Sequence, residues 1–283
     1  MSEKFELRVV TYMCPTHPVE LYELILELLE ESINCYTTLQ YESRTPGPFP
    51  DRPDPFITDK VDLAFMTAGA YMNLRDCKNT AMELLPVTPV FAHQMNVENK
   101  PGYFSDIIIH SDKKGHNVNT LLDLRGCNFA YSDEVSLSGT KIVLKTLKEK
   151  GENASFFGSL LRSGSHLASA QMVLSKQAEW AAVDSTTLLY SKKFMQDGGR
   201  DITILETLGR LPPYPIVINA KLPEEIKSAI AKALLNLPHV GQWKKRFAQF
   251  GVIKFERNGD AVYDGPAAQM RAVPSEKLNI RYY

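Results

Sequence analysis

The sequence has almost no net charge and no long apolar segment. Its 283 residues include 32 Lys and Arg against 33 Asp and Glu, which gives a formal net charge of -1. This balance gives no support for binding to nucleic acid or to an anionic membrane surface. No apolar run approaches the roughly 18 residues that a membrane-spanning helix needs. We therefore expect a globular protein with neither a nucleic-acid partner nor a membrane partner.

The N-terminus lacks the features of an export signal. Met1 to Lys4 lead directly into the strand-like segment 5–13, with no basic segment, apolar segment or small-residue cleavage site. The four cysteines show no C-x-x-C pairing, and Cys14 lies beyond the first predicted strand, so no lipid-anchor motif is present. Reduced thiols in the cytosol are the simplest interpretation. Unless a leader was removed before residue 1, we expect a cytoplasmic protein without an ABC permease partner.

Helix and strand patterns alternate along the chain, which is typical of parallel sheets flanked by helices. Residues 7–11, 35–41 and 62–66 are rich in apolar, aromatic or β-branched side chains and are predicted strands. Residues 19–33 are a predicted helix, because leucine and isoleucine recur there at helical spacing. Residues 43–55 are rich in Pro, Gly and Arg, which predicts an ordered loop or a lid.

This alternation predicts an α/β protein, and the chain is long enough for two lobes with separate cores, an organisation that the family resemblance described below implies. The first lobe is expected to comprise residues 1–93 and 210–283, and the second lobe residues 94–209. The chain would then cross between the lobes twice, as it does in hinge-bending binding proteins. We expect a central cleft between the lobes that closes on a ligand.

The most informative segment is residues 121–140. Residues 128–131 are a predicted buried strand, and a helical pattern begins near Ile142. The residues just before that helix are hydroxylated or small, namely Ser136, Ser138, Gly139 and Thr140. A helix N-terminus carries unsatisfied N–H donors and a partial positive charge, so hydroxyls added there favour binding of a phosphate, phosphonate or carboxylate. Taken alone, the same residues are equally typical of an ordinary helix N-cap.

The segments on either side of this motif resemble, in order, those of a known family. Gly102 to Ile109 and the turn Asp123–Gly126 precede it, and Gly164-Ser165-His166 and Trp180 to Ser185 follow it. This order resembles the phosphonate-binding family of substrate-binding proteins, which are soluble receptors of ABC importers. The resemblance covers about residues 61–217 and implies a two-lobe, type 2 periplasmic-binding-protein-like fold. It also implies that the serine-rich turn holds the anion and that His166 assists.

Two departures from the family pattern concern the ligand. The family's Ser-Thr-Ser-Gly segment is Ser136-Leu137-Ser138-Gly139 here, so an apolar side chain replaces one hydroxyl donor. Family members that bind aminoalkyl phosphonates have an acidic residue before a Pro-Ile-Val strand, where this chain has Tyr214. An ammonium group on the ligand would lose its counter-charge at that point. The resemblance therefore supports the mode of anion binding better than the identity of the ligand.

His166 and Asp184 are the titratable candidates near this motif. An imidazole has an unperturbed pKa near 6.5, so His166 would donate to an oxyanion and make the affinity dependent on pH. Asp184 either orients His166, binds a ligand hydroxyl, or caps the predicted helix 186–190.

The first lobe supplies further candidates. In open α/β sheets, ligands bind beyond the carboxyl ends of the strands. That rule selects Thr67 and Tyr71, which would close on the ligand from the first lobe. Tyr12, Tyr41 and Tyr214 would supply aromatic walls with polar tips. Each of these tyrosines is equally compatible with a place on the lobe surface.

The predicted function is binding of a small anionic metabolite in the cleft of a soluble intracellular protein. The alternative is a cytosolic enzyme of the same fold that acts on a small organic acid or a cofactor precursor. Ser136 or Ser138, with His166 and Asp184, supplies the residue types of a hydrolytic triad, but no G-x-S-x-G elbow is present. Cys14 and His17 lack the paired spacing of a metal site. We expect no metal and no cofactor, assign no catalytic residue, and favour binding without turnover.

Overall fold

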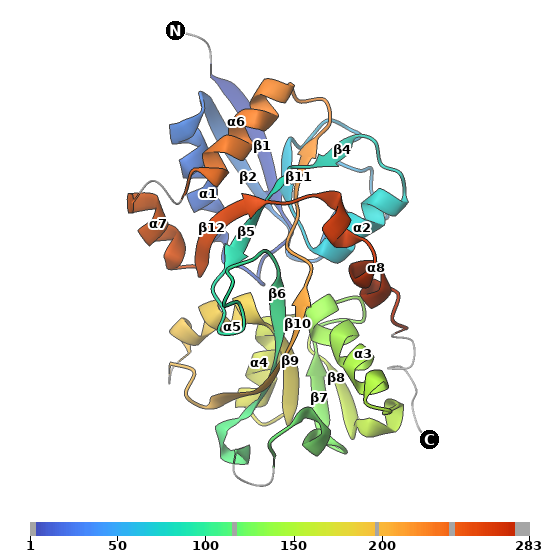
Figure 1. Cartoon of the computed structure of the whole chain (residues 1–283). Coiled ribbons are helices and arrows are strands. Elements are labelled where there is room, and N and C mark those ends of the chain that lie inside the picture. Colours follow the sequence, from blue (N-terminus) through green and yellow to red (C-terminus); the bar gives the residue numbers. More distant parts are fainter. Residues whose placement is uncertain (1–3, 115–117, 196–197, 238–240, 275–283) are drawn as a thin grey trace. The chain divides into compact units, whose positions relative to one another are not determined.

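The computed structural model describes residues 4–114, 118–195, 198–237 and 241–274 (Figure 1). These residues form two compact units. The first contains the described residues of Met1–Gly102 and Pro212–Asp264, and the second those of Tyr103–Leu211 and of the segment that begins at Gly265. Each unit has its own five-stranded sheet with helices beside it. The α/β class predicted from the sequence is therefore confirmed.

The first unit is built on a mixed sheet. Its strands are β1 (Phe5–Thr11), β2 (Cys35–Tyr41), β3 (Leu63–Phe65), β4 (Met82–Leu84), β5 (Val87–Phe91), β11 (Ile216–Asn219) and β12 (Val252–Arg257). The sheet order is β2-β1-β3-β11-β4, and β12 and β5 form a separate antiparallel pair. Strand β1 is parallel to β2 and β3, whereas β11 is antiparallel to β3 and β4.

The helices of the first unit pack through apolar faces. They are α1 (Val19–Ser32), α2 (Ala68–Asp76), α6 (Glu224–Leu235), α7 (Gly241–Ala248) and the 3₁₀ turn η7 (Asp260–Tyr263). Helix α1 buries Leu21, Leu24 and Ile25 among other residues of one face, as their spacing predicts, and it contacts β2 and α6. Each such side chain stabilises the fold by about 1.5–3 kcal/mol when fully buried.

The second unit repeats this plan with a different core. Its strands are β6 (Tyr103–His110), β7 (Asn128–Tyr131), β8 (Ser159–Arg162), β9 (Trp180–Asp184) and β10 (Ile202–Leu211). They lie in the order β10-β6-β9-β7-β8, with β7 parallel to β8 and β9. Trp180 is fully buried at the centre and stacks on Phe129 with 4.1 Å between the ring centroids.

Helices and short turns connect these strands. They are α3 (Ile142–Glu149), α4 (His166–Leu174), α5 (Ser185–Ser191), α8 (Pro266–Arg271), the π-helical turn η3 (Leu137–Lys141) and the 3₁₀ turns η1 (Ser111–Lys113), η2 (Leu121–Leu124), η4 (Ala154–Phe156) and η5 (Lys192–Phe194). Helix α4 contacts β9, and α5 contacts β6. Turn η3 leads from the end of β7 into α3 and contains the serine motif.

Both sheets are mixed, which corrects the expectation of parallel sheets. Strand β6 follows the crossing between Gly102 and Tyr103, and β11 follows the crossing between Leu211 and Pro212. Two consecutive strands of one sheet can be parallel only if a crossover connection, which is nearly always right-handed, returns the chain to the same end of the sheet. A strand that enters from the other unit lacks that connection, and both β6 and β11 pair antiparallel with their neighbours.

The division into units differs from the predicted lobes at the C-terminus. The predicted first lobe includes all residues after 210, whereas the segment from Gly265 on belongs to the second unit. Helix α8 contacts η3, and the Lys141 ammonium donates to the carbonyl oxygen of Val273 at 2.5 Å. The chain thus passes between the units a third time, between Asp264 and Gly265.

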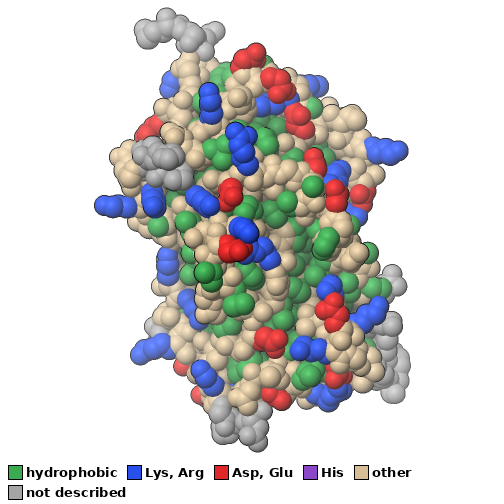
Figure 2. All heavy atoms as spheres, in the orientation of Figure 1, with side chains coloured by type: hydrophobic (Ala, Val, Ile, Leu, Met, Phe, Trp, Pro, Cys, Tyr) green, Lys and Arg blue, Asp and Glu red, His purple; other side chains and the backbone are tan. Residues whose placement is uncertain are grey.

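The surface charges and the cysteines agree with the composition of the chain. On the face drawn in Figure 2, Lys and Arg side chains are interspersed with Asp and Glu, in keeping with the near-zero net charge. All four cysteines lie in described segments and are free thiols. Among the helices of the described segments, none is long and apolar enough to cross a bilayer.

Candidate functional site

The turn between β7 and α3 is shaped by its own side chains. The Asp133 carboxylate accepts hydrogen bonds from the backbone N–H groups of Val135 at 2.9 Å and Ser136 at 2.7 Å. The Ser136 hydroxyl oxygen accepts from the N–H of Gly139 at 3.0 Å, and so caps the helical turn. Because that oxygen acts as an acceptor here, the Ser136 hydroxyl proton can be donated elsewhere.

The next two hydroxyls of the motif have different surroundings. Ser138 is buried, and its hydroxyl oxygen lies 3.3 Å from Nε2 of His166. Thr140 is also buried, but its hydroxyl donates to the carbonyl oxygen of Asp133 at 2.5 Å. Thr140 therefore uses its proton inside the turn, where it holds the turn's shape.

His166 begins α4 and faces this turn. Its Nε2 atom lies 3.4 Å from the hydroxyl oxygen of Ser136 and 3.3 Å from that of Ser138. Its Nδ1 atom accepts a hydrogen bond from the backbone N–H of Asp184 at 3.2 Å. In the neutral tautomer that makes this contact, Nδ1 carries no proton and Nε2 carries it. His166 therefore presents an N–H donor beside the two serine hydroxyls.

Burial favours the neutral form of that ring. Burial lowers the pKa of His166, while the carboxylates of Asp184 and Asp133 and the carbonyl of Ala182 act in the opposite direction. The desolvation effect is the larger one, because it penalises only the charged imidazolium.

Asp184 combines two of the roles that the sequence leaves open. Its carboxylate caps α5, accepting from the backbone N–H of Thr186 at 2.8 Å and from the Thr186 hydroxyl at 2.6 Å. Its backbone N–H, rather than its carboxylate, is the group that holds Nδ1 of His166. Both contacts arise because β9 ends at Asp184, beside the start of α4.

The structure adds Ser132, which the sequence reasoning missed. Ser132 follows β7 directly and is 2% exposed, and its hydroxyl has no hydrogen-bond partner among the described residues. A Cβ atom placed on Gly139 would clash with that hydroxyl, and it would lie 3.0 Å from the Ser136 hydroxyl and 3.1 Å from Cε1 of His166. In the sequence, Ser132 is only a serine after a predicted strand, and serines are common in loops, so its position alone did not indicate a site.

The first-unit candidates Thr67 and Tyr71 have local partners. Thr67 caps α2 by accepting from the N–H of Ala70 at 3.2 Å. Tyr71 is buried, and its hydroxyl donates to the carboxylate of Asp260 in the same unit. Burial and this hydrogen bond both raise the pKa of Tyr71. Their role as ligand contacts stays a prediction.

The other three candidate tyrosines of the first unit differ in exposure. Tyr41 is 66% exposed, whereas Tyr12 and Tyr214 are 8% and 5% exposed. Burial, with smaller effects of Asp54 and Glu42, raises the pKa of Tyr12 to about 12. The ring of Tyr214 contacts His17 and Phe91. The role of these three tyrosines in binding also stays a prediction.

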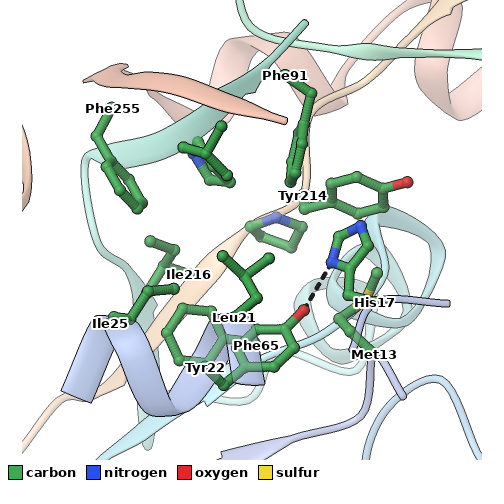
Figure 3. Close-up of a pocket in the computed structure, with 13 residues that line it drawn as sticks. Met13, His17, Leu21, Tyr22, Ile25, Phe65, Phe91, Tyr214, Ile216 and Phe255 are labelled. Carbon is green, nitrogen blue, oxygen red and sulfur yellow. Dashed lines mark hydrogen bonds between the residues drawn. The ribbon is translucent and has the colours of Figure 1, made fainter. Parts of the chain in front are cut away.

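Tyr214 instead lines a small apolar cavity inside the first unit (Figure 3). The cavity measures about 20 Å³, which is room for roughly one water molecule. Its walls include Leu21, Phe65 and Phe255, and His17 lies edge-on to Tyr214 with 4.8 Å between ring centroids. The cavity is therefore a packing feature of this core, too small for a metabolite.

The chemistry of the second-unit cluster is that of a donor site. In a Ser-His-Asp triad, Nδ1 of the histidine carries a proton that it donates to a carboxylate, and Nε2 accepts the serine proton. Here Nδ1 is an acceptor and Nε2 carries the proton. In that tautomer, Ser136 and Ser138 face an N–H donor. Among the described residues, no group of three or more His, Cys, Asp or Glu side chains is placed to hold a metal ion.

Comparison with solved structures defines the class of protein. A binding-protein component of an ABC phosphonate transporter from Pseudomonas aeruginosa superposes with a TM-score of 0.71 over 94% of this chain and 85% of that one, at 19% identity. PhnD1 from Prochlorococcus marinus in complex with methylphosphonate gives a TM-score of 0.69 over 94% of this chain and 96% of that one, at 14% identity. The fold is thus the two-lobe, type 2 periplasmic-binding-protein fold that the motif order implies.

Comparison of the sequence places the chain within this class. A family model described as ABC transporter, phosphonate, periplasmic substrate-binding protein matches residues 9–263. The chain therefore belongs to the phosphonate substrate-binding protein family. The phosphonates-binding periplasmic protein of Escherichia coli is 27% identical over 206 residues, which cover 71% of this chain and 58% of that relative.

Proposed function

We propose that the protein binds a small phosphonate or phosphate-like anion at Ser136, Ser138 and His166, and releases it unchanged. The observation that carries this proposal is the convergence of two serine hydroxyls on the Nε2–H of a buried, neutral histidine at the start of a helix. Hydrogen bonds from such donors to an anion are charge-assisted and contribute about 1.5–3 kcal/mol each. Membership of the phosphonate-binding family supports the same ligand class.

Binding without turnover fits the assigned tautomer. A general base needs a free lone pair facing the proton that it removes. His166 directs N–H toward the hydroxyls and has its other nitrogen held by the Asp184 backbone. In that tautomer the enzyme alternative would require a base other than His166. The cytosolic location, the absence of a permease partner and closure of a hinge on the ligand stay predictions.

Calorimetry with methylphosphonate and inorganic phosphate tests the proposal. We expect Ser136→Ala with Ser138→Ala to lower the affinity for the better ligand at least tenfold, because two charge-assisted hydrogen bonds are lost. The matched control is Ser155→Ala with Ser159→Ala, two exposed serines of the same unit, which should leave the affinity unchanged. Equal affinities of wild type and the motif variant would place the site elsewhere. Mass analysis of the ligand after overnight incubation tests turnover, and a change that depends on the protein would favour the enzyme alternative.

A further inference from the structure

Ser132 is a buried hydroxyl that the fold leaves unsatisfied. It is 2% exposed and has no hydrogen-bond partner among the described residues. Burying a hydroxyl without a partner is unfavourable, and most buried polar groups in folded proteins are paired. Alanine at this position would remove the unpaired hydroxyl and still follow β7. Since no described residue is its partner, the Ser132 hydroxyl is a candidate donor to a bound ligand.

The position of this hydroxyl points to the anion site. A Cβ atom on Gly139 would collide with the Ser132 hydroxyl and would approach both the Ser136 hydroxyl and the His166 ring. These three side chains therefore surround the same side of Gly139. Because glycine has no side chain, the Ser132 hydroxyl can lie this close to the Gly139 backbone, next to the Ser136 hydroxyl and the His166 ring.

We propose that Ser132 is a further ligand-binding residue, whose hydroxyl donates a third hydroxyl hydrogen bond to the anion. This inference rests on the proposed function of the Ser136, Ser138 and His166 cluster. In the family resemblance the missing hydroxyl falls at Leu137, which is apolar and buried here. Ser132 supplies a donor from the strand end in place of the one lost from the turn.

A third hydroxyl donor also defines the class of anion. A phosphonate or phosphate group presents three or more oxygens in a tetrahedral arrangement, whereas a carboxylate presents two oxygens in a plane. The proposed donors come from different segments: Ser132 follows β7, Ser136 and Ser138 lie at the start of η3, and His166 begins α4. Such an arrangement favours a tetrahedral anion over a planar one.

Ser132→Ala tests this role through two measurements with opposite expected signs. We expect the affinity for methylphosphonate, measured by calorimetry, to fall five- to tenfold and the affinity for acetate to change less than twofold. In the absence of ligand we expect the melting temperature to stay the same or to rise, because the substitution removes an unpaired buried hydroxyl. The control is Ser191→Ala, a buried serine of the same unit whose hydroxyl donates to the carbonyl of Leu188 at 3.4 Å. That variant should keep its affinity and lose some thermal stability.

The outcomes separate this inference from the proposed function. Unchanged methylphosphonate affinity of Ser132→Ala, beside a loss in the Ser136 and Ser138 variant, would refute the role of Ser132 and keep the anion site. A fall in the melting temperature of ligand-free Ser132→Ala would also count against it, since the hydroxyl would then have a structural partner. Failure of the wild type to bind methylphosphonate or phosphate at millimolar concentration would refute both.

Discussion

The two units each contain a buried histidine, and the two rings have opposite surroundings. His17 of the first unit is 3% exposed and lies among aromatic rings, with Nδ1 2.7 Å from the Tyr22 hydroxyl (Figure 3). His166 of the second unit is 8% exposed and lies among serine hydroxyls and a backbone N–H. Burial is similar, but the described contacts of His17 are mainly with aromatic rings, whereas those of His166 are with two hydroxyls and a backbone N–H.

The difference shows that a buried histidine becomes a site through its neighbours. Around His17, the rings of Phe91 and Tyr214 fill the space and leave a cavity of about 20 Å³. Around His166, the Ser136 and Ser138 hydroxyls lie within 3.4 Å of Nε2, and the nearby Ser132 hydroxyl has no hydrogen-bond partner among the described residues. We infer that His17 contributes mainly packing and His166 mainly recognition. Three predictions test that contrast.

The largest effect should follow from filling the space beside Gly139. In Gly139→Ala, the added methyl group would collide with the Ser132 hydroxyl and crowd the Ser136 hydroxyl and the His166 ring, which would displace the proposed donors. We expect the affinity for methylphosphonate to fall at least 100-fold, with the circular dichroism spectrum retained. Gly241→Ala, at the start of α7, is the matched control, because its added methyl group meets no atom within 4 Å. Binding by Gly139→Ala within threefold of wild type would show that the anion lies elsewhere.

The same substitution at the two histidines should separate their roles. Phenylalanine keeps an aromatic ring and removes both nitrogens. We expect His166→Phe to lower the affinity at least tenfold, because the Nε2–H donor is lost. We expect His17→Phe to keep the affinity within twofold and to lower the free energy of unfolding by about 1–2 kcal/mol, because the buried Tyr22 hydroxyl loses its contact with Nδ1. Calorimetry measures the affinity, and urea unfolding measures the free energy of unfolding. An equal loss of affinity in both variants would show that the two histidines do not differ in their role in binding.

Sequence periodicity was sufficient for much of the fold. The helix predicted over residues 19–33 is observed as α1, and the predicted strands near residues 7–11, 35–41 and 62–66 are observed as β1, β2 and β3. These are local patterns, in which the spacing of apolar side chains determines the element. The mixed sheets were missed because strand direction depends on where the chain re-enters a unit, which periodicity does not encode.

The site was predictable only where its residues are close in sequence or match a known motif. Ser136, Ser138 and His166 come together as the motif order suggested. The inward hydrogen bond of Thr140 and the pairing of Tyr71 with Asp260 depend on tertiary packing, the latter across 189 positions of the chain. Ser132 became a candidate only through its burial and its approach to Gly139, neither of which a sequence position reveals.

The smallest expected effect is a change in the pH dependence of the free energy of unfolding, and it arises from His166. Above a pH of about 6.5, which is the ordinary pKa of histidine, His166 is neutral in the folded and unfolded chains and adds no pH dependence to stability. Below that pH the unfolded chain takes up a proton that the folded chain does not, because burial lowers the pKa of His166 in the fold. The free energy of unfolding should therefore decline as the pH falls toward the lowered pKa, by at most about 1.4 kcal/mol per pH unit from this group.

Urea unfolding between pH 7.5 and pH 5, compared with the same series for His166→Phe, isolates this contribution. The wild type should lose more stability than the variant over that range, and parallel curves would mean that His166 is not held neutral. Saturating methylphosphonate should reduce the difference, because a bound anion favours the protonated ring.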